Sequence, residues 1–352
     1  MSSATEPQTA TPPLSAEGRA TPARRPKEGY WHLVWRQFRR SKLAVAALVV
    51  LLVLGFVAVA APFLAGDRPI YMVREGRTYL LPNIVDYADL VSFDYASWTP
   101  GDGEYALRPL VPYHPETSDL LRKYEAPNRE HWLGTDDRGR DVLSRMVWDT
   151  RISMSVGFVA TGIAVLIGIV IGALAGYYRG WVDIVVLRLI EVMLCFPTFI
   201  LILALIAFLP PSIWNIMVVL GITGWTGSAR LVRGEFLKLR ESDFVTAARA
   251  TGLRDARIIF RHVLPNALSP VFVTATFGVA GAILTESALS FLGFGVPPPT
   301  ASWGEVLSQS QRVVDFAWWL VTFPGLAIFV TVTCFNLVGD GLRDAMDPRL
   351  RQ

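Results

Sequence analysis

The sequence predicts an all-α polytopic membrane protein with six transmembrane helices and a polar subdomain after the first of them. Of its 352 residues, 52% are hydrophobic and only 18% are charged, whereas a soluble domain carries about 25% charged residues. The apolar residues are also gathered into long blocks, which indicates that a bilayer is the solvent for much of the chain. Six blocks are candidate transmembrane helices: 43–65, 152–178, 184–209, 213–229, 268–294 and 318–338.

The segment before the first block divides into two parts. Residues 1–27 are rich in Pro, Ala, Thr, Ser and Arg without apolar periodicity, which predicts a disordered tail. Residues 30–42 alternate Trp31, Trp35 and Phe38 with basic residues, a pattern typical of a helix lying at an anionic membrane surface. We therefore expect residues 1–42 to form a tail and an interfacial helix.

The first block, 43–65, has a cleaved signal peptide as its alternative interpretation, with Ala58-Val59-Ala60 as the cleavage site. However, the polar segment before it is too long, and the apolar run exceeds the usual core of about 7 to 15 residues. A retained first transmembrane helix is therefore favoured.

The rest of the chain divides into a polar segment and a core. Residues 66–151 carry many acids and several prolines, which predicts a loop subdomain, while 152–340 hold the other five apolar blocks and 341–352 form the C-terminus. Basic residues outnumber acids before the first block and between the fourth and fifth. The positive-inside rule therefore places those segments and both termini in the cytoplasm and the 66–151 subdomain outside.

The loop at 235–266 predicts a helix–turn–helix on the cytoplasmic face. One short helix would end at Thr251, Gly252 would supply a left-handed turn, and a second helix would run from Asp255 to His262. Spacing alone is equally compatible with an ordinary positively charged loop. In the first interpretation the exposed surface, ringed by arginines, would consist of Ala247, Ala248, Thr251 and Leu253.

The start of the fifth block is marked by Pro265 and Pro270. Prolines favour the first turn of a helix, so this pattern predicts a helix that restarts here, capped by Asn266 or Ser269.

The order of residues in the loop resembles the EAA loop of ABC importer permeases. Ala247-Ala248, Gly252 and Leu264-Pro265 stand at the family's intervals, whereas Thr246 replaces its Glu and His262 its Ile, although ArgHisValLeuProAsn is similar to the peptide-importer branch. In that family the loop is a coupling helix seated in a cleft of a cytoplasmic ATPase. The resemblance implies that Ala247, Ala248 and Gly252 dock there. The residues assigned to this coupling loop are Thr246, Ala247, Ala248, Thr251, Gly252, Leu253, Leu264 and Pro265.

Three further motifs extend the resemblance over most of the chain from residue 131 onward. Residues 131–145 are similar to the entry of the second transmembrane helix in oligopeptide, dipeptide and nickel permeases, and 289–293 and 336–349 match the same branch. The resemblance implies the type I ABC importer permease fold. The long insert at 66–131 looks more like the branch that imports microcin C and related oligopeptides.

Two features of the apolar blocks concern packing and transport. Small residues recur every four positions in the second block (Ala164, Gly168, Gly172, Gly176), which predicts close helix packing. Glu286 is the charged residue deepest in an apolar block, where a carboxylate must face protein or water. Two roles stay open for it: it lines a translocation path with Ser287 and Ser290, or it is a buried anchor that these serines and Thr285 satisfy.

Absent motifs exclude several functions. No lysine follows a glycine, so there is no GxxxxGK[ST] phosphate loop and the chain is not the ATPase of a transporter. No GxSxG or HExxH motif is present, and Cys195 and Cys334 are not in metal-ligand spacing, so we expect no enzyme activity, metal or cofactor. The basic residues lie beside apolar blocks as topology signals, which disfavours nucleic acid as a partner.

We therefore expect an importer permease in the bacterial inner membrane. The resemblance implies a heterodimer with a second homologous permease, which forms a path for di- and oligopeptides delivered by an extracytoplasmic binding protein. Two cytoplasmic ATP-binding subunits would supply the energy, and lipid would surround the helices. The alternatives are an ion-coupled transporter or channel, which should show inverted symmetry and several mid-membrane ionisable residues, and a scaffold without transport.

Overall fold

The computed structural model describes residues 29–91, 93–95, 97–295 and 299–347. The tail predicted at 1–27 lies outside these residues. The helices are α1 (Tyr30–Phe38), α2 (Lys42–Leu64), α3 (Val142–Tyr178), α4 (Gly180–Cys195), α5 (Thr198–Phe208), α6 (Ile213–Leu239), α7 (Asp243–Ala250), α8 (Asp255–Arg257), α9 (Leu264–Phe291), α10 (Trp303–Gln309) and α11 (Trp319–Met346). The strands are β1 (Tyr71–Arg74), β2 (Arg77–Leu80) and β3 (Tyr105–Leu107).

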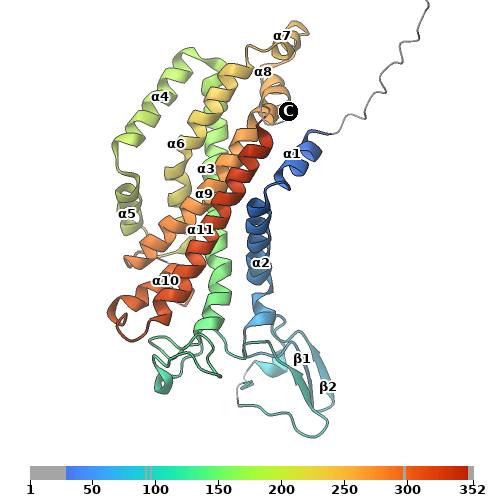
Figure 1. Ribbon diagram of the computed structural model, residues 1–352, viewed down its shortest axis with the longest axis vertical. Helices are drawn as coiled ribbons and strands as arrows, with labels where there is room; N and C mark the ends of the chain where they lie inside the picture. The colour runs from blue at the N-terminus through green and yellow to red at the C-terminus, as the bar shows by residue number, and fades with distance from the viewer. Residues whose placement is uncertain (1–28, 92, 96, 296–298, 348–352) are drawn as a thin grey trace, which may run out of the picture.

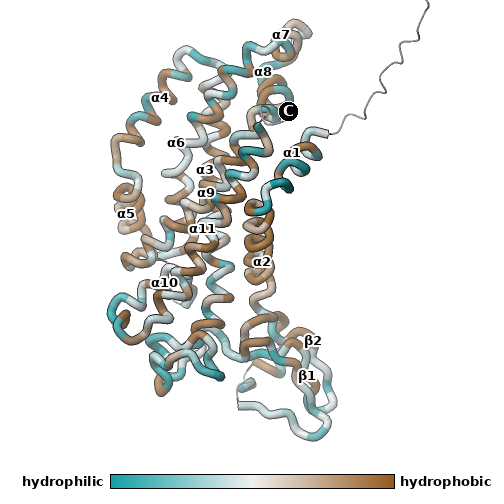
Figure 2. The backbone as a smooth tube through the Cα atoms, in the orientation of Figure 1, coloured by the Kyte–Doolittle hydropathy of each residue, from teal (hydrophilic) through white to brown (hydrophobic). Residues whose placement is uncertain are grey.

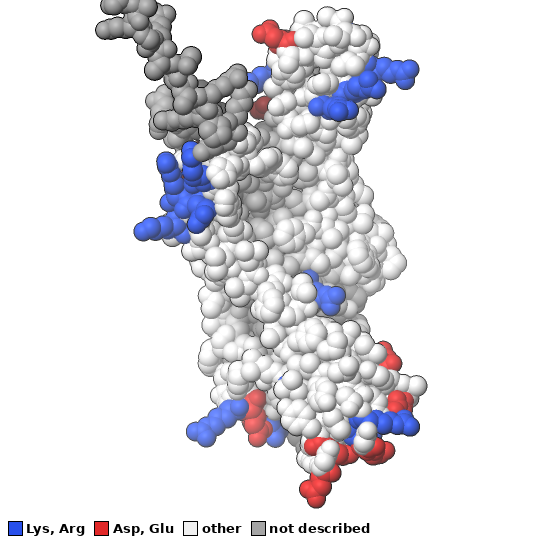
Figure 3. All heavy atoms as spheres, turned by 90° about the vertical axis from the view of Figure 1, so that its right-hand side faces the viewer, with Lys and Arg blue, Asp and Glu red and all other residues white. Residues whose placement is uncertain are grey.

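Long helices run between two ends of an elongated molecule (Figure 1). α7 and α8 lie at one end, together with α1, and the strands lie at the other, which we call the outer end. Teal, hydrophilic segments gather towards the two ends, whereas α2 is brown over most of its length (Figure 2). The face drawn in Figure 3 likewise carries its charged side chains mainly near the two ends. This distribution is the one that a bilayer crossed by the long helices requires.

Four helical segments among the described residues are long and apolar enough to cross a membrane: α2, α3, the continuous helix from Asp255 to Phe291, and α11. The pair α4 and α5 passes the same test together but is bent by 84°, so it is a broken span or a re-entrant loop. The 27-residue helix α6 is not among the segments that pass. The described structure therefore contains four or five spans by this criterion, and the predicted count of six includes α6.

The third apolar block is not the single helix predicted at 184–209. Helix α4 ends at Cys195, Phe196 has extended backbone angles, and α5 begins only at Thr198. Pro197 explains the break, because the ring of a proline disfavours the helical conformation of the residue before it.

The predicted restart of a helix at Pro265 is also wrong. A π-helical segment, Ile258–Val263, joins α8 to α9 without a break. Asn266 does not cap α9, since its side-chain amide donates to the carbonyl of His262 at 2.7 Å. The wider π turn accommodates Pro265, whose missing N–H leaves one carbonyl of the preceding turn without its helical partner.

The stripe of small residues in α3 packs on α6, as predicted. A Cβ on Gly168 would lie 2.5 Å from Ser228 Cβ, and one on Gly172 would lie 2.5 Å from the carbonyl oxygen of Ala229. Because both distances are shorter than van der Waals contact, only glycine allows this approach of the two backbones. α3 and α6 therefore pack as a closely fitted pair.

The segment between α2 and α3 contains a small antiparallel sheet of order β2-β1-β3. Its core is aromatic and is formed by Met72, Tyr79, Leu90 and Tyr95. The sheet is the part of the described structure that the all-α prediction leaves out. Short strands separated by turns carry little periodicity, so the composition of this polar segment gave no signal for them.

Helix α1 is amphipathic. Val34 and Phe38, one turn apart, are buried against Ala44 of α2 and Ala345 of α11. Trp31 and Trp35 are exposed, and the neighbouring Arg39, Arg40 and Lys42 are exposed as well.

Candidate functional site

The loop between α6 and α9 folds into the predicted short helix and turn at the end of the molecule away from the strands (Figure 1). Helix α7 ends at Ala250, and Gly252 follows with φ of +75°, the left-handed region that favours glycine. The N–H of Gly252 donates to the carbonyl of Arg249 at 2.9 Å, and that of Leu253 donates to Ala248 at 3.3 Å. Gly252 therefore closes α7 and turns the chain into α8, as the sequence predicted.

Helix α7 has a buried face and an exposed face. Val245 is fully buried and Ala248 is 8% exposed, and both pack on a core that includes Phe236, Ile258 and Val263. The two residues are three positions apart, which places them on one side of a helix. The other side faces solvent and carries Thr246 and Ala247, and the exposed surface continues through Thr251 and Gly252.

The predicted docking residues therefore do not form one surface. Ala248 belongs to the core, and Leu253 and Leu264 are half-buried against it, whereas Pro265 is exposed. The alternation arises because α7 packs on the segment Ile258–Val263 and on the core that this segment shares with α3 and α6, a tertiary arrangement that spacing in the loop does not reveal. Thr246, which replaces the family's Glu, donates its hydroxyl hydrogen to the carbonyl of Ser242 at 3.3 Å.

Tyr177, near the end of α3, joins the loop to the rest of the molecule. Its side chain is 3% exposed, and its hydroxyl donates to Asp255 Oδ1 at 2.6 Å. The guanidinium carbons of Arg249 and Arg240 lie 5.2 and 5.9 Å from its ring centroid, within the range of cation–π attraction. Arg240 also donates to the carbonyl of Tyr177. One side chain thus contacts α7, α8 and the residue that follows α6.

Sequence reasoning did not single out Tyr177. The only signal for it was a pair of tyrosines at the end of an apolar block, followed by a basic loop.

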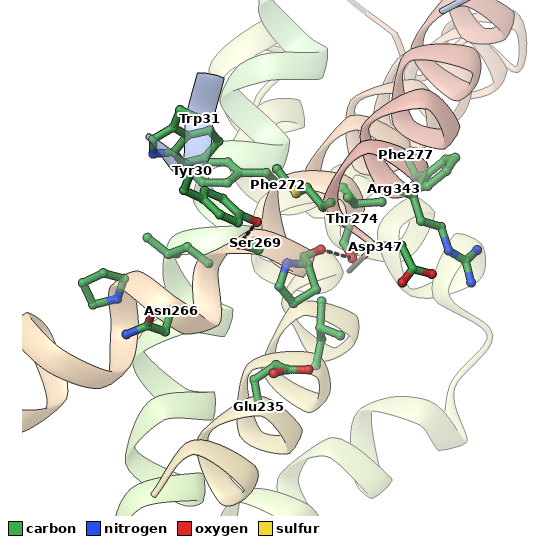
Figure 4. A pocket seen from close by; sticks show the side chains of 16 residues that line it. Tyr30, Trp31, Glu235, Asn266, Ser269, Phe272, Thr274, Phe277, Arg343 and Asp347 are labelled. Carbon is green, nitrogen blue, oxygen red and sulfur yellow. Dashed lines mark hydrogen bonds between the residues drawn. The ribbon is translucent and has the colours of Figure 1, made fainter. Parts of the chain in front are cut away.

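Two cavities lie along α6 and α9. The first has a volume of about 1000 Å³ and lies between α1, α6, α9 and α11, beside the α7 loop (Figure 4). Tyr30 at its rim shares a hydrogen bond of 3.1 Å with Ser269 of α9. The second, of about 370 Å³, lies between α3, α5, α6 and α9 and is lined by small and hydroxyl residues such as Thr161, Thr223 and Gly278. Thr274 and Phe277 line both cavities.

Glu286 lies in the protein interior. Its side chain is fully buried, and Oε1 accepts hydrogen bonds from Ser290 and Ser302, each at 2.6 Å. Ser287 donates its hydroxyl hydrogen to the carbonyl of Ile283 within its own helix at 2.8 Å. Among the residues that the structure describes, Glu286 Oε2 has no hydrogen-bond partner. This geometry favours the buried anchor over the path-lining role, and Ser302, at the start of α10, is a partner that the sequence did not reveal.

Comparison with known proteins agrees with this architecture. A family model described as "Binding-protein-dependent transport system inner membrane component" matches residues 168–352, the part that contains the α7 loop and most of the residues that line the two cavities. The chain belongs to this family. A second model, "N-terminal TM domain of oligopeptide transport permease C", matches residues 29–82. The resemblance predicted from the motifs is therefore confirmed.

Individual relatives of this permease carry peptide-transport names. It is 36% identical to the dipeptide transport system permease protein DppC of Alkalihalophilus pseudofirmus over 91% of this chain and 90% of that protein. It is 39% identical to the oligopeptide transport system permease protein OppC of Bacillus subtilis over 68% of this chain and 79% of that protein. A chain of the MetNI methionine ABC transporter, solved in an inward-facing conformation, has 19% identity and a TM-score of 0.49 over 58% of this chain and 98% of that chain.

The permease motif at 131–145 forms a buried ionic network at the outer end. Arg145, 1% exposed, donates to Asp136 Oδ2 at 2.6 Å, to Gln309 Oε1 at 3.1 Å and to Glu305. His131 Nδ1 lies 2.9 Å from Asp141 Oδ2. Burial raises the pKa of the Asp141 carboxyl, while hydrogen bonds from the Ser144 N–H and from His131 act in the opposite direction. The motif thus holds the segment before α3, α3 itself and α10 together.

Proposed function

We propose that this chain is one of two permease subunits of an ATP-driven importer of di- and oligopeptides. The observation that carries the proposal is a family match that includes the α7 loop, which presents small exposed residues outward and is braced from behind by a buried core. The chain itself has no phosphate loop, so the energy comes from two cytoplasmic ATP-binding subunits. The peptide names of the relatives support the substrate class.

The exposed side of the α7 loop is the surface that docks the ATPase. Ala247, Thr251 and Gly252 are small and exposed, so a cleft in the partner can approach the backbone closely. Ala248, Leu253 and Leu264 act from beneath by holding α7 against α3 and α6. The role of the loop is thus divided between contact and support.

The translocation path runs along the two cavities beside α6 and α9. Both cavities are lined by Thr274 and Phe277, so they are adjacent. Together they extend from the end that carries the α7 loop into the apolar part of the helices. Hydroxyls and backbone at glycines can hydrogen-bond peptides of many sequences, and specificity then rests with an extracytoplasmic binding protein. The second permease of the heterodimer completes the wall of the path.

The loop, α1 and both termini face the cytoplasm, and the 66–151 subdomain faces outward with access to the binding protein. Six spans, with α6 and the bent α4–α5 pair each counted as one, agree with this orientation. Arg36 of α1 and the neighbouring Arg39, Arg40 and Lys42 support it, since lysine and arginine gather on the cytoplasmic side. The exposed Trp31 and Trp35 suit the headgroup layer of the lipid.

The experiment that tests the proposal is gentle purification of the tagged chain, followed by mass spectrometry and reconstitution. We expect a second permease and phosphate-loop ATPases to accompany it, and peptide uptake by the reconstituted complex to require ATP and a binding protein. A lone chain that drives uptake with an ion gradient and no ATP would contradict the proposal. Stable recovery of a chain that neither binds ATPases nor transports would instead favour the scaffold.

A further inference from the structure

Helix α3 is as long as the continuous helix from Asp255 to Phe291 and has the features of a rigid rod. It spans 37 residues, a length of about 55 Å at 1.5 Å per residue. It contains no proline, whereas α2 and α11 each contain one and α9 contains two. Proline is a principal cause of helix kinks, so α3 lacks the feature that would let its two ends move independently. Its close glycine contacts with α6 stiffen it further.

One end of this rod contacts the loop through the side chain of Tyr177, and Arg179, which follows α3, also donates to Glu241 at 3.2 Å. The hydroxyl of Tyr177 reaches Asp255, and its ring contacts the guanidinium groups of Arg249 and Arg240. Arg249 lies in α7, Arg240 precedes this helix and Asp255 follows it. A displacement of α7 therefore changes all three contacts of Tyr177 at once. A hydrogen bond to a carboxylate is among the stronger ones in proteins, so the contact between Tyr177 and Asp255 can persist while α7 moves.

The other end of the rod is fixed to α10 by buried groups. Arg145 bonds Glu305 and Gln309 of that helix, and the backbone N–H of Trp303 donates to Ser153 Oγ at 3.2 Å. The indole N–H of Trp303 donates to the carbonyl of Met146, also at 3.2 Å. Buried ionic groups hold one geometry because separating them leaves an unpaired charge in the interior. A displacement of this end of α3 therefore acts on α10, which also packs on α9 and α11.

From these contacts we propose that α3 transmits the position of the α7 loop to α10 at the outer end, with Tyr177 and Arg145 as its two positioning residues. The inference rests on the proposed function, because ATP-driven movement of the loop is the input. It adds that α3 is a route by which movement of the loop reaches the outer end. Tyr177 acts through Asp255 and touches no substrate.

The test uses the complete reconstituted complex with a reporter on α10. Ser308 is half-buried on α10, and Ser308→Cys, in a background of Cys195→Ser and Cys334→Ala, gives this chain a single thiol, whose labelling is read on the isolated chain after denaturation. The rate at which a maleimide labels this thiol is measured with and without ATP. We expect ATP to change the rate in the parent complex. In Tyr177→Phe, which keeps the ring, we expect the ATP-dependent change to fall roughly tenfold while ATP hydrolysis continues.

Tyr178→Phe is the matched control. Tyr178 is 48% exposed, and its hydroxyl makes no hydrogen bond within the described part of the chain, so this variant should behave like the parent. Asp255→Asn keeps an acceptor oxygen and should retain most of the response. Asp255→Ala should lose it, and Tyr177→Phe combined with Asp255→Ala should be no worse than either single change.

Two results would overturn the inference: a full ATP-dependent labelling change in Tyr177→Phe, or an equal loss in Tyr178→Phe. Failure of the proposed function would look different, because the parent complex itself would then show no ATP-dependent peptide uptake. Equal yield and elution volume of the variants exclude a folding defect as the cause of a lost response.

Discussion

Ala247 and Ala248 are neighbours in the chain, yet one lies on the exposed face of α7 and the other on its buried face. Ala247 is exposed at the end of the molecule, whereas Ala248 packs beside Val245 on the core formed with α3 and α6. Two identical side chains therefore divide between them the two tasks of the loop, which are contact with a partner and support of the helix that makes the contact. Substitutions at the two positions should separate these tasks.

Enlarging each alanine should give opposite phenotypes. Ala248→Leu forces extra volume into a filled core, so we expect the free energy of unfolding to fall by about 1–3 kcal/mol. Ala247→Leu changes an exposed position, which costs within about 0.5 kcal/mol, but it obstructs the docking cleft and should reduce the ATPase that co-purifies. Thermal unfolding and quantitative mass spectrometry measure the two effects. Equal shifts in melting temperature would show that the assignment of faces is wrong.

Gly252 should tolerate a larger side chain in the isolated chain but not in the complex. A Cβ there would meet no described atom within 4 Å, so only the left-handed backbone opposes it, at a cost of roughly 1 kcal/mol. We expect Gly252→Ala to bear that backbone cost alone, and Gly252→Arg to abolish coupled uptake while folding persists. The readouts are the melting temperature and peptide uptake per ATP hydrolysed. Normal uptake by Gly252→Arg would remove Gly252 from the docking surface.

Local signals were enough to predict the parts of the fold that depend on one segment alone. The glycine stripe of α3 predicted close packing, and Gly252 predicted the left-handed turn after α7, since only glycine adopts such backbone geometry readily. Long apolar blocks predicted the helices that a bilayer requires. In each case the residue type itself carries the physical constraint.

The parts that the sequence did not reveal depend on contacts between distant segments. Tyr177 meets Asp255 across 78 positions, and Arg145 meets Glu305 across 160. The second helix was therefore expected to start at 152, because the charged residues before that point look unsuited to a buried helix. Arg145, for example, is paired with Glu305 on α10 and with Asp136 in the segment before α3, and α3 begins at Val142.

The geometry around Glu286 predicts a role in stability rather than in substrate contact. Ser302→Ala removes one donor from a fully buried carboxylate, which should cost about 1–3 kcal/mol. Glu286→Gln keeps an acceptor for both serines and should leave peptide uptake close to that of the parent. Melting temperature and uptake of several peptides check both statements. A change in peptide preference in Glu286→Gln, with unchanged stability, would restore the path-lining role.

The packing of α3 on α6 predicts opposite effects for one substitution at two glycines of the same helix. A Cβ on Gly172 would lie 2.5 Å from the carbonyl oxygen of Ala229 and 3.1 Å from the backbone nitrogen of Arg233, whereas one on Gly162 would meet no described atom within 4 Å. Because alanine favours a helix interior over glycine by about 1 kcal/mol, Gly162→Ala should be neutral or stabilising. Gly172→Ala must push two backbones apart and should lower the melting temperature and weaken ATP-coupled uptake. Thermal unfolding of both variants in one detergent makes the comparison, and equal behaviour would show that the two helices do not approach this closely.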